Sequence, residues 1–115
     1  MNISIIKEPM KVDELKQIAK NGFGDFVKAV VDVELELMAI GGELHADEEI
    51  ILSEQGSKRE YMWGINIYPD QREETWIEFD SMINIKPHLG NRSRGVEDIG
   101  VQKKVRAIVD KLIYR

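Results

Sequence analysis

Apolar residues recur along this chain with two different periods, and each period indicates one kind of element. Strict alternation of apolar and polar side chains is typical of half-buried strands. It predicts strands over residues 26–40, 60–68 and 75–85, and a short apolar stretch predicts one more over residues 2–7. Fifteen residues is long for one strand, so residues 26–40 are expected to form a hairpin that turns near Glu34–Glu36, although no Gly, Asn or Pro marks the turn.

Helical spacing occupies the remaining parts of the chain. Apolar side chains separated by three and four residues are typical of amphipathic helices, and they predict helices over residues 11–21 and 97–114. A shorter helix is expected over residues 47–55, with Asp47 as its N-cap and Gly56 as its C-terminal stop.

The predicted elements follow the order β-α-β-β-α-β-β-α. Because hairpins dominate this order, we expect an α+β fold with a mainly antiparallel sheet of about five strands and three helices packed on one face. No linker, repeat or low-complexity tract interrupts the sequence, so residues 1–115 are expected to form a single domain.

The composition narrows the range of functions. The chain has no cysteine, which excludes disulfides, thiolate zinc sites and iron–sulfur clusters. Its formal net charge is −5, whereas a domain that grips nucleic acid by its phosphates usually carries positive charge, so nucleic acid is not an expected partner. The sequence has no apolar run of about 18 residues that would span a membrane and no signal peptide at its start. We therefore expect a soluble, cytoplasmic protein.

The loop before the last predicted helix, Gly-Asn-Arg-Ser-Arg-Gly, is the most site-like segment. Free N–H groups at a helix start favour an anion, glycine lets the backbone approach it, and arginine adds bidentate contacts. We expect Arg92 and Arg94 to contact a small anionic ligand while Asn91 and Ser93 orient the loop. The alternative is a capped loop whose arginines pair with Glu97, Asp98 or the acidic helix.

Acidic residues and one histidine form a second candidate site. His45 and Asp47 lie at the start of the predicted middle helix, while Glu78 and Asp80 are two residues apart on a predicted strand and so project to one face. Oxygen ligands with an added imidazole suit divalent cations. The four residues could therefore hold a divalent cation as the cofactor of a hydrolase. The alternative is a set of solvated charges, some of which complement a helix start.

Several longer stretches resemble one protein family. They are the four motifs GGELHADE (residues 41–48), WGINIYP (63–69), WIEFDSMINI (76–85) and NRSRGVED (91–98), together with the shorter stretches VVDV (30–33) and Ala-Ile (39–40). Together they resemble a small prokaryotic family of domains of unknown function, over nearly the whole chain. The resemblance implies an uncharacterised prokaryotic protein that stands alone as one domain, with no characterised activity. The residues that carry it are polar: Glu43, His45, Asp47, Asn66, Glu78, Asp80, Asn91, Arg92 and Arg94.

A scaffold alone would not need so many polar positions, which favours a real site where the acidic and basic segments meet. Three functions stay open: binding of an anionic ligand at the arginine loop, metal-dependent hydrolysis, and an interaction module that dimerises through an exposed strand such as 2–7 or 60–68. Both a monomer and a homodimer are compatible with the sequence. The first two functions depend on whether the carboxylates near His45 face the same cleft as Arg92 and Arg94.

Overall fold

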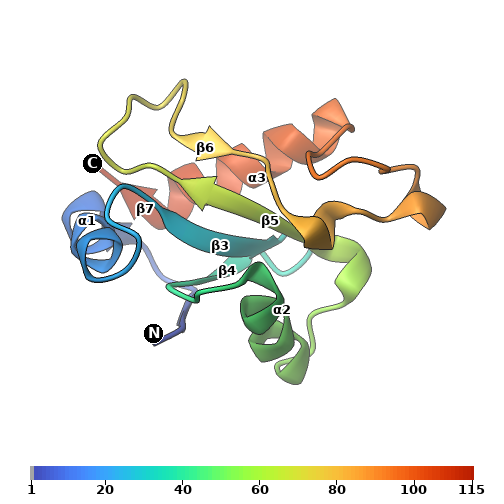
Figure 1. Cartoon of the computed structure of the whole chain (residues 1–115), viewed down its shortest axis with the longest axis horizontal. Coiled ribbons are helices and arrows are strands. Elements are labelled where there is room, and N and C mark those ends of the chain that lie inside the picture. Colours follow the sequence, from blue (N-terminus) through green and yellow to red (C-terminus); the bar gives the residue numbers. More distant parts are fainter. Residues whose placement is uncertain (1) are drawn as a thin grey trace.

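The computed structural model describes residues 2–115, which form a five-stranded antiparallel sheet with helices on both faces (Figure 1). In spatial order the strands are β1 (Ser4–Ile6), β4 (Leu37–Ile40), β3 (Val27–Asp32), β5 (Met62–Ile67) and β6 (Ile77–Glu78). The helices are α1 (Val12–Asn21), α2 (His45–Glu54) and α3 (Ile99–Leu112). Two further short strands, β2 (Met10–Lys11) and β7 (Ile113–Tyr114), pair in parallel outside this sheet. The predicted α+β class is confirmed.

One face of the sheet is covered by α1 and α3, and this contact forms the main core. Val27, Ala29 and Val31 of β3 share this face, because alternate residues of a strand point to the same side. Leu15 of α1 and Val109 of α3 belong to the same buried cluster. Each fully buried valine or leucine side chain in this cluster contributes roughly 1.5–3 kcal/mol to stability.

The opposite face of the sheet carries α2, which Figure 1 shows on the other side of the strands from α3. Leu52 of α2 clusters with Val30 of β3 and Met62 of β5. The expectation that all three helices pack on one face is therefore wrong. The reason lies in β3, where the consecutive residues Ala29, Val30 and Val31 are all fully buried. A strand covered on both faces reads as a nearly continuous apolar run rather than a clean alternation.

The hairpin predicted over residues 26–40 is confirmed, with β3 and β4 antiparallel. Its turn begins at Asp32, whose Oδ1 accepts hydrogen bonds from the N–H groups of Glu34 and Leu35 at 2.8 and 3.0 Å. An aspartate that bonds the backbone two residues on is a turn signal in its own right. Glu36 completes the turn in a left-handed conformation, with φ of 55°.

The strand predicted over residues 75–85 is much shorter in the structure. Of residues 75–85, only Ile77–Glu78 (β6) form a strand that pairs with β5, and the 3₁₀ helix Met82–Asn84 follows. Ser81 begins this helix by accepting the N–H of Ile83 through its hydroxyl at 3.3 Å. The alternation was misleading because Ser81 and Asn84 are buried as hydrogen-bonding groups.

The three helices occur where the sequence placed them, with shifted ends. α1 and α3 fill most of the predicted ranges, whereas α2 begins at His45, two residues before the predicted start. Asp47 therefore lies inside the first turn, and Leu44 is the N-cap residue. In the described part of the chain, none of the helices has the length and apolar character needed to cross a membrane.

Candidate functional site

Polar side chains from distant segments gather on the α2 face of the sheet, toward β6. Lys28 of β3, Asn66 of β5 and Glu78 of β6 form one row across the sheet, because the register pairs Lys28 with Asn66 and Asn66 with Glu78. His45 of α2 lies over β5 next to this row. We name the following set the polar cluster: Lys28, His45, Asn66, Glu78, Asp80 and Arg94.

Asn66 is the buried centre of the row. Its Nδ2 donates to Glu78 Oε1 at 2.9 Å, and the hydroxyl of Tyr68 donates to the same oxygen at 3.1 Å. The residue is only 6% exposed, and its Oδ1 accepts no hydrogen bond from any group in residues 2–115. A buried polar atom without a partner is uncommon in native structures. This oxygen is therefore a candidate contact for a ligand.

His45 is held as a neutral imidazole. Burial lowers its pKa from 6.5 to about 4, and its hydrogen bond to the backbone of Ile65 opposes this shift. Nε2 lies 2.7 Å from the Ile65 carbonyl oxygen. Because that oxygen can only accept, Nε2 must carry the proton and Nδ1 keeps a free lone pair. The charges of Lys28, Asp80 and Arg94 also act on this pKa, so all three lie within electrostatic reach of the ring.

Arg94 connects the arginine loop to the polar cluster. Its Nε donates to Asp80 Oδ1 at 2.6 Å, in a pair whose side chains are 56% and 44% exposed. A pair this open to water is worth at most about 1 kcal/mol. Only Nε is used, so the two Nη groups of the guanidinium have no partner among the described residues.

The rest of the arginine loop binds a carboxylate of the chain itself. The N–H groups of Arg92 and Ser93 donate to Glu97 Oε2 at 2.8 and 3.0 Å, and these bonds lower the pKa of Glu97. Asp98 accepts from the first N–H groups of α3. Asn91 is buried, and its Nδ2 donates to the carbonyl oxygens of Asn84, Ser93 and Gly95. The backbone donors that suggested an anion site are thus already paired.

Three of the four residues suggested as metal ligands, His45, Glu78 and Asp80, belong to the polar cluster, but their ligating atoms do not converge on one point. His45 and Asp80 are within electrostatic reach of each other, but His45 uses Nε2 on the backbone and Asp80 binds Arg94. Glu78 binds Asn66, and Asp47 is exposed on α2. Within residues 2–115, no group of three or more His, Asp or Glu side chains is arranged to hold a metal ion.

Lys28 contributes a positive charge that no carboxylate in the described residues pairs with. Its Nζ lies 5.5 Å from the ring centroid of Phe23 and 5.8 Å from that of Phe26. Phe26 in turn packs against Tyr68, with 5.3 Å between the ring centroids. Cation–π contacts at such positions contribute roughly 0.5–1 kcal/mol. They leave the ammonium donors free for an added ligand.

Beneath α2, the side chain of Glu48 is fully buried. The sequence pattern did not predict this burial. Glu48 Oε2 accepts the N–H of Gly42 at 2.9 Å, while Oε1 has no partner in the part of the chain that the structure describes. Burial raises the pKa of Glu48 from 4.5 to about 9. The side chain is therefore protonated at neutral pH.

Lys86 is a second buried ionisable residue that the sequence did not reveal. Its Nζ donates to the carbonyl oxygens of Met62 and Ile83 at 2.8 and 2.9 Å and lies 4.3 Å from the ring centroid of Trp63. Burial lowers its pKa from 10.5 to about 8, so the ammonium form still dominates at neutral pH. Through these hydrogen bonds, Lys86 holds the segment that follows β6 against the start of β5.

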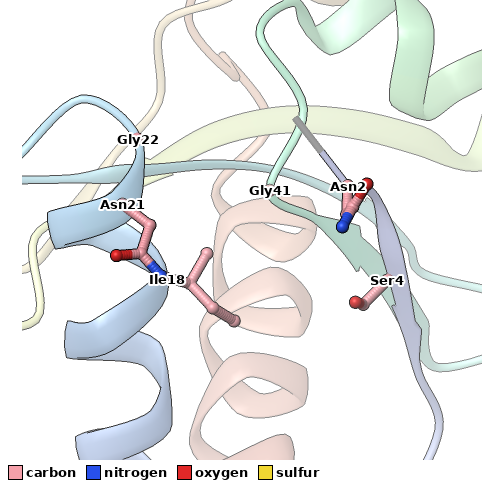
Figure 2. A pocket seen from close by; sticks show the side chains of 6 residues that line it. All are labelled: Asn2, Ser4, Ile18, Asn21, Gly22 and Gly41. Carbon is pink, nitrogen blue, oxygen red and sulfur yellow. The ribbon is translucent and has the colours of Figure 1, made fainter.

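A cavity of about 530 Å³ lies between the end of α1 and the edge strand β1 (Figure 2). It is lined by Asn2, Ser4, Ile18, Asn21, Gly22 and Gly41. Figure 2 shows Ile18 and Asn21 on the α1 side and Asn2 and Ser4 on the strand side. None of the lining side chains is charged, so this cavity offers hydrogen bonds but no acid–base chemistry.

All residues of the polar cluster lie within the part of the chain that a known family model covers. The family is described as "Protein of unknown function (DUF5674)", and its model matches residues 4–112. The chain belongs to this family. No curated protein and no solved structure shows a significant match to this chain.

In this DUF5674 protein, the four motifs singled out in the sequence meet at the polar cluster. The first motif supplies His45, the second Asn66, the third Glu78 and Asp80, and the fourth Arg94. Lys28 joins them from outside the motifs and could have been found only from the register of β3 and β5.

Proposed function

We propose that this DUF5674 protein binds a small organic anion at the polar cluster, with Lys28 and Arg94 as the charged contacts. The observation that carries the proposal is the meeting of residues from all four sequence motifs on one surface. Two cations lie near a neutral histidine there, and neither their remaining donors nor the buried amide oxygen of Asn66 has a partner within residues 2–115.

The proposal places the anion on side chains rather than on the backbone of the arginine loop. Glu97 holds the N–H groups of Arg92 and Ser93, and a group in the same chain competes with any free anion at high effective concentration. The Nη groups of Arg94 and the Nζ of Lys28 meet no such competitor. The charge of Arg92 acts on Glu97 and is not among the charges that act on His45, so Arg92 is expected to contribute little to binding.

The acceptors in the polar cluster define the rest of the ligand. Asn66 Oδ1 and His45 Nδ1 can only accept, so a ligand that satisfies them must carry hydroxyl or amino donors beside its anionic group. Phe26 and Tyr68 add an aromatic wall. A hydroxy acid or a nucleotide has both features, whereas the hydroxyl donors of inorganic phosphate belong to the anionic group itself and cannot reach the acceptors while that group binds the cations.

The test is an NMR titration of the full chain with inorganic phosphate, citrate and adenosine monophosphate as separate probes. We expect amide shifts in residues 27–29 and 64–67, and stronger binding of citrate or the nucleotide than of phosphate. Lys28→Met and Arg94→Gln should each weaken binding by about tenfold, which corresponds to one charge-assisted hydrogen bond.

Arg92→Gln is the matched control, because it removes a guanidinium from the same loop but not from the polar cluster. It should leave the affinity within about twofold of the wild type. Shifts confined to residues 92–98 and lost in Arg92→Gln would move the anion to the loop. No shift with any of the three probes at millimolar concentration would remove the proposal.

A second candidate function is self-association through the sheet edge. Among residues 2–115, β1 pairs only with β4, so one side of Ser4–Ile6 has backbone groups that can template another strand. The other segment considered, residues 60–68, contains β5, which lies between β3 and β6. Light scattering should then give a dimer mass that falls to the monomer mass in Ser4→Lys. A monomer for the wild type at high concentration would exclude this candidate.

A further inference from the structure

A groove runs along α3 on the face of the sheet opposite to the polar cluster. It consists of two adjoining cavities of about 350 and 320 Å³, which share Val33, Tyr61 and Lys104. One cavity continues to Ile108 of α3, and the other continues to Trp63 of β5. Together they have the volume of a typical ligand or peptide site.

The floor of this groove, which we name the α3 groove, is apolar. Val33, Trp63 and Val101 line it, and Leu89 adds an apolar side chain that is 46% exposed. Exposed leucines scattered singly need no explanation. Here, however, Leu89 borders a hollow with further apolar residues, which is the arrangement that marks interaction sites.

The rim of the α3 groove is acidic. Five carboxylate residues line the two cavities beside the one lysine that also lines them, Lys104: Glu34, Glu36, Glu60, Glu97 and Asp98. Glu36 pairs with Lys111 at 3.5 Å, and Glu97 and Asp98 accept backbone N–H groups, which leaves Glu34 and Glu60 as the carboxylates most open to a partner. The field of this rim acts on Tyr61, whose pKa is raised chiefly by the charge of Glu34 and then by that of Glu60. The groove therefore combines an apolar floor with an excess of negative charge.

We infer that the α3 groove binds a basic segment of a partner protein, with apolar side chains seated on the floor and lysines or arginines facing the acidic rim. Charge complementarity favours such an occupant, because opposite potentials steer association and suppress wrong partners. A second copy of this chain is a poor occupant, since each copy has a formal net charge of −5 and would bring further negative charge to the rim.

The experiment is a selection of short random peptides displayed on phage against the wild-type full chain. We expect the selected peptides to be enriched in Lys and Arg together with Leu or aromatic residues. Their binding should weaken by at least about tenfold in the double variant Glu34→Lys/Glu60→Lys, because like charges then face each other. Leu89→Ser, which alters the floor at an exposed position, should weaken binding as well.

Asp25→Lys/Glu54→Lys is the matched control, because it makes the same charge change at exposed residues outside the groove. It should leave peptide binding unchanged. Circular dichroism of each variant separates lost binding from lost folding. Enrichment of neutral or acidic peptides, or peptides that bind the groove variants and the wild type equally well, would overturn the inference. Neither result bears on the proposed anion site, which lies on the other face of the sheet.

Discussion

The side chain of Asn84 pairs with the backbone of Gly64 in both directions, as a neighbouring strand would. The N–H of Gly64 donates to Asn84 Oδ1 at 2.7 Å, and Asn84 Nδ2 donates back to the Gly64 carbonyl at 2.9 Å. The same Nδ2 also donates to the carbonyl of Arg94 at 2.8 Å. One amide therefore closes the open edge of β5 beyond β6 and fixes the loop that carries Arg94.

Replacing Asn84 by alanine should destabilise the protein by about 2–4 kcal/mol, because it leaves several buried backbone groups without partners. Urea unfolding measures the change. Asn21→Ala is the control, since Asn21 is exposed and makes only one exposed side-chain hydrogen bond, to Gln17. It should stay within about 0.5 kcal/mol of the wild type. Equal stabilities of the two variants would contradict this role of Asn84.

Gly64 is required because nothing larger fits against the segment that follows β6. A Cβ at this position would lie 2.6 Å from both Cβ and Oγ of Ser81. Gly64→Ala should therefore cost about 1–3 kcal/mol in unfolding free energy, as overpacking of a tight interior does. Gly95→Ala tests the reasoning, because a Cβ there would make only ordinary contacts, the nearest at 3.5 Å. A thermal melt in which both variants behave alike would argue against a steric cause.

The sequence predicted best the elements in which burial alone decides the pattern of apolar and polar side chains. Val27, Ala29 and Val31 lie on one face of β3, and their spacing of two predicts this strand. Asp32 adds a turn signal, because its side chain accepts a backbone N–H two residues on. The segment after β6 could not be predicted, because Asn84 replaces a strand partner through a side chain. A side chain that takes the place of a strand can be recognised only once the backbone that it pairs with is known.

The polar cluster was predictable as a set of residue types but not as a place. His45 and Arg94 were both singled out, and their meeting depends on α2 lying over β5 and on the loop reaching β6. A loop motif alone does not show whether its N–H groups are available to a ligand. Here the N–H groups of Arg92 and Ser93, which favoured an anion site, donate to the carboxylate of Glu97. The burial of Lys86 and Glu48 could not be predicted from the sequence, because charged residues are mostly exposed and no neighbouring residue marks these two as exceptions.

Lys86 should make stability rise with pH in an alkaline window. Its pKa is lowered from 10.5 to about 8 in the folded protein, so between these values the unfolded chain binds the extra proton and stability increases with pH. Lys86→Met keeps an apolar stem against Trp63 and removes the titration. Denaturant unfolding of both proteins between pH 8 and 10 should show a rise in the wild type that the variant lacks. Parallel curves would mean that the ammonium is not perturbed by burial.

Glu48 should have the opposite effect in a lower window. Its pKa rises from 4.5 to about 9 on folding. Between these values the folded state holds a proton that the unfolded state has lost, so stability falls as pH increases. Glutamine resembles the protonated carboxyl and can still accept the N–H of Gly42, so Glu48→Gln should match the wild type near pH 4.5.

At higher pH the two proteins should separate, with the variant gaining over the wild type by up to about 1.4 kcal/mol for each pH unit. Urea unfolding at a series of pH values between about 5 and 8 measures the difference. Glu54→Gln, at the exposed end of α2, controls for the amide substitution itself. If Glu48→Gln follows the wild type across the whole range, Glu48 must be ionised in the folded protein. The nearby ammonium of Lys28 would then be its counter-charge, and Lys28 would not be free to bind an added anion.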